Sequence, residues 1–170
     1  MAVTIPPGVD SDGRLNVIWA PTNSLSIATI GGATAIELAG YLTKGSFGES
    51  ADTDRGTDER VASKTVYEVL GKSKFTITDL EYVWEPQATA ASPTNKAYDT
   101  LKPRTAGFLY VRWGKDVDTA LTVGDKVDIF PVTVGEQVRK TPEGNAAEKL
   151  KIQQPIIVTG PAVRDAVLTA

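Results

Sequence analysis

The sequence predicts a mainly β protein: a β-sandwich or small-barrel core with one short flanking helix, a long polar loop and extended terminal arms. Two observations favour this class. Short segments in which apolar and polar residues alternate are separated by clusters of Gly, Pro, Asn and Asp. Helical spacing of apolar residues occurs in one short segment, 92–102, which ends at a proline. With 170 residues, we expect a single domain over 1–170.

The elements follow in order along the chain. Residues 1–13 are expected to form an arm, because Pro6 and Pro7 disfavour a helix and the sequence DSDG at 10–13 is typical of a turn. A C-terminal tail is expected over 160–170. Apolar segments that indicate strands lie between them, at 15–19, 26–30, 36–42, 65–84, 108–113, 127–134 and 150–158.

Three of these segments carry irregularities. In 65–84 the alternation changes phase at 78–79, which indicates a bulge or a strand that changes sheets, and 71–73 is either a turn or a kink. Segment 108–113 is apolar on both faces, as in a central strand. Pro131 lies where 127–134 changes phase and indicates a sheet edge or a bulge.

The longest polar interval, 44–63, is rich in Asp, Glu and Gly and is expected to be a loop. A structureless loop of this length is uncommon in a compact domain, and it is usually functional or disordered until it meets a partner. We therefore expect this charged loop to contact another copy of the protein.

Composition excludes several functional classes. The chain has no Cys and no His, which excludes disulfides, thiolate chemistry and His-based catalysis or metal binding. Its net charge of −3 gives no basic surface for nucleic acid or anionic membrane. The N-terminus lacks the features of a secretory signal, and no apolar run is long enough to span a bilayer. We expect a protein made in the cytoplasm, without enzymatic activity, cofactor, metal or membrane partner.

Other candidate sites are better explained as ordinary structural features than as binding sites. The acidic turns at 10–13 and 52–56 lack the Gly and Glu positions of a calcium loop. Trp19, Trp84 and Trp113 lie in alternating apolar segments and are expected in the core or an interface, rather than in a sugar-stacking platform. Dispersed cations, including Arg112 and Arg139, indicate a solvated mixed surface, with ion pairing between subunits as the alternative.

Several short motifs occur together along nearly the whole chain. They are IPPGVDSDGR at 5–14, VIW at 17–19, AIEL at 35–38, YLT at 41–43, TDER at 57–60, YE at 67–68, LEYVW at 80–84, AYDTLKP at 97–103, GF at 107–108, RWG at 112–114 and VTG at 158–160. In this order they resemble the major tail tube proteins of long, flexible-tailed (siphovirus-type) bacteriophages, particularly those that infect actinobacteria.

The resemblance implies a structural virion protein. Six copies would form a ring whose inner strands line a channel, and rings would stack around a tape-measure protein, with tail tip and tail terminator proteins at the ends. The tube would conduct double-stranded DNA during delivery into the host cell. A net negative charge suits this role, because an acidic lumen repels phosphates.

The resemblance also implies that the arm, the long loop and the tail bridge subunits and rings. The residues expected to make these contacts are Ile5, Pro6, Pro7, Phe47, Glu49, Asp52, Asp54, Arg55, Asp58, Glu59, Arg60, Pro161 and Arg164.

Two functions from other classes remain open. The first is a monomeric β-sandwich binding module, such as a virion decoration or carbohydrate-binding domain, which would need an exposed aromatic or polar platform. The second is a small hydrolase that uses carboxylates alone, which would need a pair of them held in a cleft.

Overall fold

The computed structural model describes residues 9–60, 64–89, 92–144 and 148–170, and it confirms a mainly β fold with several sheets. Its helical elements are short: α1 (Ile27–Ile30), the 3-10 helix η1 (Pro93–Asn95) and α2 (Lys96–Thr100). Its strands are β1 (Leu15–Ala20), β2 (Ile36–Glu37), β3 (Glu49–Asp58), β4 (Tyr67–Ile77), β5 (Leu80–Val83), β6 (Ala106–Trp113), β7 (Lys126–Val134), β8 (Val138–Lys140), β9 (Lys151–Gln154), β10 (Ile156–Val158) and β11 (Val163–Val167).

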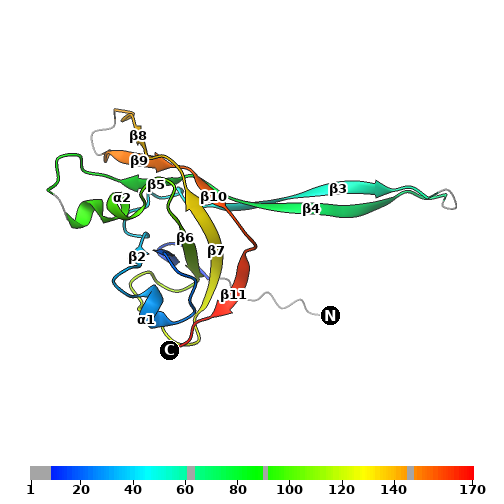
Figure 1. Cartoon of the computed structure of the whole chain (residues 1–170), viewed down its shortest axis with the longest axis horizontal. Coiled ribbons are helices and arrows are strands. Elements are labelled where there is room, and N and C mark those ends of the chain that lie inside the picture. Colours follow the sequence, from blue (N-terminus) through cyan, green and yellow to red (C-terminus); the bar gives the residue numbers. More distant parts are fainter. Residues whose placement is uncertain (1–8, 61–63, 90–91, 145–147) are drawn as a thin grey trace.

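The main sheet has six strands, in the order β10-β7-β6-β1-β2, with β11 also paired to β7 (Figure 1). Strand β6 is central, as its apolar faces predict. Strand β7 pairs with β6 along one side and with two strands in succession along the other. Pro131 lies between the β11-paired stretch, which ends at Ile129, and the β10-paired stretch, which begins at Val132. The expectation that this proline marks a sheet edge or a bulge is therefore wrong. Strand β7 pairs with β6 here without irregularity, and Pro131 lies where β7 changes neighbours on its other side.

Both faces of the main sheet are buried. Side chains such as Val17 and Leu109 pack on one face against the three-stranded sheet β5-β9-β8 and against α2. Side chains such as Ile18 and Tyr110 pack on the other face with Ile30 of α1. Burial of both faces also explains the phase change in β7. Val127 and Ile129 are buried on one face, and Phe130, Val132 and Val134 are buried on the other. The pairing of β7 with β6 is regular throughout, so the phase change is not a bulge.

The chain crosses between sheets at two points. Strand β4 ends at Ile77, and β5 begins at Leu80 in a different sheet. This confirms that the phase change at 78–79 marks a strand that changes sheets. Strands β9 and β10 are separated by Pro155, where the chain passes from the three-stranded sheet to the main sheet.

The expected loop over 44–63 is largely a strand. Residues Glu49–Asp58 form β3, which pairs antiparallel with β4 in a long hairpin, and 71–73 is a kink inside β4 rather than a turn. The pairing shifts register between Thr53 and Arg55, as at a β-bulge. Sequence periodicity missed β3 because both of its faces meet solvent, so no apolar face alternates with a polar one.

Two further expectations need correction. The tail over 160–170 contains β11, and Leu168 is buried in the core beneath the main sheet, so the tail belongs to the fold. A bulge between Val163 and Ala166 breaks the alternation that would have revealed a strand. The short strand expected at 26–30 is the helical turn α1, closed by a hydrogen bond from the Gly31 amide to the Ile27 carbonyl. The arm is described from Val9 onward, and Val9 is exposed.

A close approach between β6 and β1 predicts the effect of one substitution. A Cβ on Gly107 would lie 2.6 Å from the ring of Trp19, which is buried in the core. We expect Gly107→Ala to lower the free energy of unfolding by about 1–3 kcal/mol, because the ring has no space into which to retreat. Urea denaturation measures this change. Gly40→Ala is the matched control, since a Cβ there meets nothing within 4 Å. Equal stability of the two variants would contradict the prediction.

Candidate assembly surface

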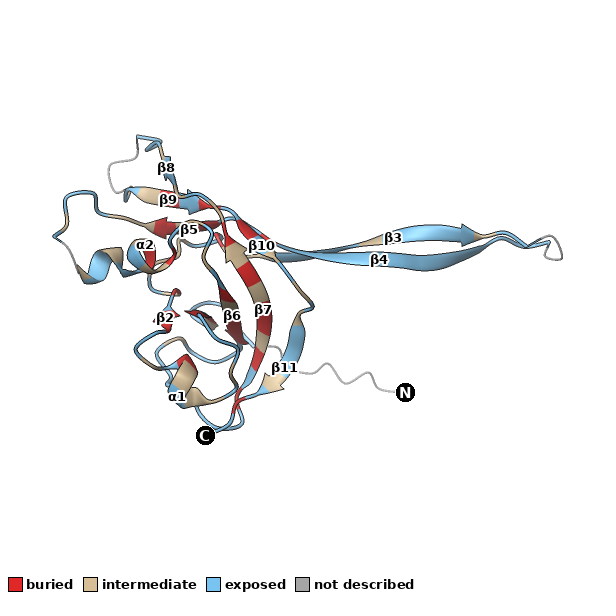
Figure 2. Cartoon of the chain, in the orientation of Figure 1, coloured by how far each residue is buried: buried red, intermediate tan, exposed pale blue. Residues whose placement is uncertain are grey.

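The β3–β4 hairpin is the largest feature outside the core. Figure 1 shows it projecting away from the body of the molecule. Its strands have 10 and 11 residues, and at about 3.3 Å per residue a ten-residue strand extends about 33 Å. Ile77, at the base, is the one buried residue of these strands, and Figure 2 shows the hairpin exposed along almost all of its length.

Both faces of the hairpin carry charges of both signs. Because side chains alternate along a strand, Asp52, Asp54 and Asp58 share one face, whereas Glu49 and Arg55 share the other. Residues paired across the two strands share a face, so Lys74 of β4 lies opposite Asp52. Ion pairs on such an exposed surface contribute little to stability. These charges thus act chiefly on what approaches the hairpin.

Apolar side chains gather on the outer half of β4 and just before it. Val66, Tyr67 and Val69 are each about half exposed, and Leu70 is 80% exposed. An isolated two-stranded hairpin is at best marginally stable in water. Exposed apolar patches in soluble proteins mark surfaces that a partner covers. The outer half of the hairpin is therefore the best candidate for an assembly contact.

A cluster of contacts joins the base of the hairpin to the body. Arg164 of β11 places Nη1 2.8 Å from Oε2 of Glu49 and 2.8 Å from Oδ2 of Asp128. Its guanidinium also lies 5.6 Å from the ring centroid of Phe75 in β4 and 5.0 Å from that of Phe130 in β7. Glu49 and Arg164, both predicted from the sequence as contacts, meet each other within one chain.

The remaining predicted contact residues are spread over the chain. Arg60 pairs with Asp58 at the outer end of β3, where Nη2 and Oδ2 are 2.9 Å apart, and Glu59 lies between them. Pro161 lines a groove of about 540 Å³ between β4 and β10. Phe47 is half-buried and packs against the main core.

The arm residues of the prediction lie outside the described part of the chain. They are Ile5, Pro6 and Pro7.

The tryptophans differ in burial. Trp19 is in the core, as predicted, and Trp84 is half-buried beside Tyr98, with their ring centroids 5.8 Å apart. Arg139 lies over the Trp84 ring, 4.8 Å from its centroid. Trp113, at the end of β6, is 51% exposed.

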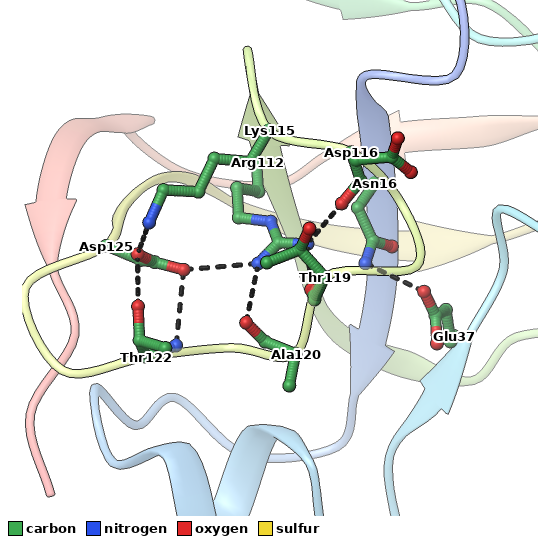
Figure 3. Close-up of polar contacts among 9 residues, drawn as sticks. All are labelled: Asn16, Glu37, Arg112, Lys115, Asp116, Thr119, Ala120, Thr122 and Asp125. Carbon is green, nitrogen blue, oxygen red and sulfur yellow. Dashed lines mark hydrogen bonds and ion pairs between the residues drawn. The ribbon is translucent and has the colours of Figure 1, made fainter.

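A buried ionic cluster was missed by sequence reasoning, which placed Arg112 on the surface. Its side chain is 1% exposed and lies 3.1 Å from Oδ2 of Asp125, which is also buried (Figure 3). Arg112 further donates hydrogen bonds to the backbone carbonyls of Asp116, Thr119 and Ala120. The signal was present: a cation in a strand that is apolar on both faces must be buried and paired.

Asp125 completes this cluster. It pairs with Lys115 and accepts hydrogen bonds from the amide and hydroxyl of Thr122. Although burial opposes the shift, these partners and Arg112 hold the pKa of Asp125 below its usual range. The cluster fixes the turn between β6 and β7, which identifies it as structural.

A second ionic cluster joins β5 to the β8–β9 pair. Lys140 Nζ lies 2.7 Å from Oε2 of Glu81, Lys151 Nζ lies 3.0 Å from Oε1, and the Thr43 hydroxyl donates to the same carboxylate. The hydrogen bond from Lys140 lowers the pKa of Glu81 from 4.5 to about 2 against the opposing effect of burial, and Lys151 and Thr43 add to the lowering.

A cavity of about 1090 Å³ lies between α1, β1, β2 and the 117–121 segment. Asn16 and Glu37 line it and bond to each other, with Nδ2 2.7 Å from Oε1 (Figure 3). Within the described ranges, no group of three or more Asp or Glu residues could hold a metal ion. No helix there is long and apolar enough to cross a membrane.

Comparison with known proteins adds three findings. The model of a family described as phage tail tube protein matches residues 2–170. A chain from the cryo-EM structure of the anti-feeding prophage baseplate, 6-fold symmetrised, has a similar fold, with a TM-score of 0.54 at 10% sequence identity over 95% of this chain and 98% of that chain. No curated protein matches the sequence significantly.

The lowered pKa of Glu81 predicts an acid-sensitive contribution to stability. The contribution is complete above pH 4.5 and is lost as the pH falls from 4.5 to about 2, because the folded carboxylate must then bind a proton. We expect Glu81→Gln to lower the free energy of unfolding by about 1–3 kcal/mol at pH 7 and by much less at pH 2. Denaturation at both pH values measures this. The control, Glu136→Gln, removes a 3.9 Å pair with Arg104 on the surface and should change neither value. An equal loss at both pH values for Glu81→Gln would contradict the assignment.

Proposed function

Since the chain belongs to the phage tail tube protein family and is thus a structural protein of the phage tail, we propose that six copies form a ring and that stacked rings form the tube. The tube conducts DNA into the host cell. The sequence motifs further favour a siphovirus-type phage of an actinobacterial host. The subunit works by assembly, without catalysis.

The exposed hairpin is the observation that carries this proposal. It extends about 33 Å from the body, and its apolar outer half has no partner among the described residues of its own chain. A contact between an extended hairpin and a different surface of the next copy is heterologous. Contacts of this kind close into rings or propagate into stacks, depending on the rotation between copies.

Several further features support the same assignment. The solved chain with the similar fold comes from a baseplate that was 6-fold symmetrised, which favours six-fold rings here. Its sequence identity is low, so this argument concerns the fold. Net charge is −3, which suits a conduit that repels phosphates if carboxylates face the lumen. The partners that we propose are other copies, the tape-measure protein, and the tail tip and tail terminator proteins.

Leu70 provides the test of the hairpin contact. It is 80% exposed, so we expect Leu70→Ser to change the free energy of unfolding by no more than about 0.5 kcal/mol. If a neighbouring copy buries Leu70, the same substitution costs about 1.5–3 kcal/mol per contact, and the concentration needed for assembly rises about tenfold or more. Negative-stain electron microscopy and light scattering across a concentration series measure this threshold.

The matched control is Val123→Ser, which replaces another exposed apolar residue, 66% exposed, in the turn before β7. Tubes that form at the same concentration for wild type and Leu70→Ser would contradict a hairpin contact. A wild-type protein that stays monomeric at every concentration and binds glycans saturably would favour the monomeric binding module instead.

A further inference from the structure

A bulge in β11 turns Arg164 toward the hairpin. The pairing of β11 with β7 shifts register between Val163 and Ala166, so Arg164 and Asp165 are the residues in the bulge. Asp165 has a φ of 52°, in the left-handed region that costs a residue other than glycine about 1 kcal/mol or more. Bulges commonly change the direction of a side chain at a functional position.

A single carboxylate holds this bulge in place. Asp128 of β7 lies within the stretch where the register shifts. Its Oδ1 accepts the Asp165 amide at 3.0 Å, and its Oδ2 accepts Nη1 of Arg164 at 2.8 Å. The backbone conformation of the bulge and the direction of the arginine are therefore fixed together by β7, an internal strand of the main sheet.

From this position Arg164 reaches both strands of the hairpin. It pairs with Glu49 at the start of β3 and lies over the ring of Phe75 in β4. On the body side it lies over the ring of Phe130. The Arg164–Glu49 pair is the only ion pair in the described part of the chain that joins a hairpin strand to another strand or helix. Figure 1 shows β11 on the side of the body from which the hairpin leaves.

Packing anchors the hairpin at its base. Ile77, at the end of β4, is buried, and Phe47, just before β3, packs against the core. Farther along the hairpin, a groove of about 540 Å³ lies between β4 and β10 beside Phe75, the residue whose ring lies next to Arg164. The angle between hairpin and body matters because the hairpin is a long lever: a tilt of about 10° at the base displaces the end of a strand about 33 Å long by about 6 Å.

We propose that Arg164 is a positioning residue that sets the direction of the β3–β4 hairpin relative to the body. It does so before assembly, through the contacts of one chain. The consequence for assembly rests on the proposed function: a hairpin held in one direction presents its apolar outer half to one site on a second copy. Pre-organisation of this kind lowers the ordering cost of association.

The direct test measures the hairpin in the monomer. The chain contains no Cys, so Thr57→Cys on β3 and Val138→Cys on β8 allow two spin labels to be attached specifically. Electron paramagnetic resonance then gives the distribution of distances between hairpin and body. We expect a single narrow distribution for the labelled wild type. With Arg164→Gln its mean should shift, or its width should grow, by about 6 Å or more.

Three variants complete the design. Arg139→Gln removes another arginine that lies over an aromatic ring, that of Trp84, away from the hairpin, and should leave the distribution narrow. Glu49→Gln breaks the link from the hairpin side and leaves the Arg164 pair with Asp128 intact. We expect Glu49→Gln to broaden the distance distribution. If Arg164→Gln fails to fold, the result for Glu49→Gln alone tests the positioning role. Arg164→Lys keeps the charge without the planar guanidinium and should give an intermediate width. Narrow, unshifted distributions for both Arg164→Gln and Glu49→Gln would overturn the proposal.

Assembly is measured separately on the same variants. If wild type forms no tubes but Arg164→Gln broadens the distance distribution, the positioning role stands and the proposed function fails. If wild type forms tubes and Arg164→Gln leaves the hairpin direction unchanged, the positioning role fails and the proposed function stands.

Discussion

The pairing of β7 with three other strands is the constraint on which the rest of the structure depends. Strand β6 occupies one of its edges, and β10 and β11 share the other. Because both faces of this sheet are covered, each neighbour of β7 is fixed by backbone hydrogen bonds and by side-chain burial. Through β10 this arrangement connects to the three-stranded sheet. Through β11 it places Arg164 beside the hairpin.

The charged and the exposed apolar residues of the hairpin have different roles in the proposed assembly. Exposed strands with free edges normally risk uncontrolled pairing with other chains, and charged side chains are a common protection. Here Asp52, Asp54 and Asp58 of β3, with Lys72 and Lys74 of β4, provide charges of this kind. In the proposed assembly, the exposed apolar residues Val66, Tyr67, Val69 and Leu70 provide the attraction to another copy.

Two kinds of ionic cluster serve different purposes in this chain. The pairs of Arg112 with Asp125 and of Glu81 with Lys140 lie inside or close to the core and fix how the turn and sheets meet. Burying such charges is costly unless hydrogen bonds satisfy them, and these clusters are rich in such bonds. The cluster around Arg164 is more exposed and joins the base of the hairpin to β7 and β11. Its contribution is to geometry more than to stability.

The sequence by itself determined the β class, the central position of β6, the change of sheets at 78–79, and the resemblance to tail tube proteins. Alternation and turn residues are local signals, and they report strands that bury one face or both. The strand β3 escaped detection because it buries neither face, and β11 because the bulge at Arg164 interrupts its alternation. Burial of Arg112 likewise depends on Asp125, thirteen residues further along the chain. Tertiary structure decided these features because pairing with β4, pairing with β7 and desolvation of a charge are relations between distant residues. The meeting of Glu49 with Arg164 is the clearest case: 115 positions separate them in the sequence, and the fold alone brings them within 3 Å.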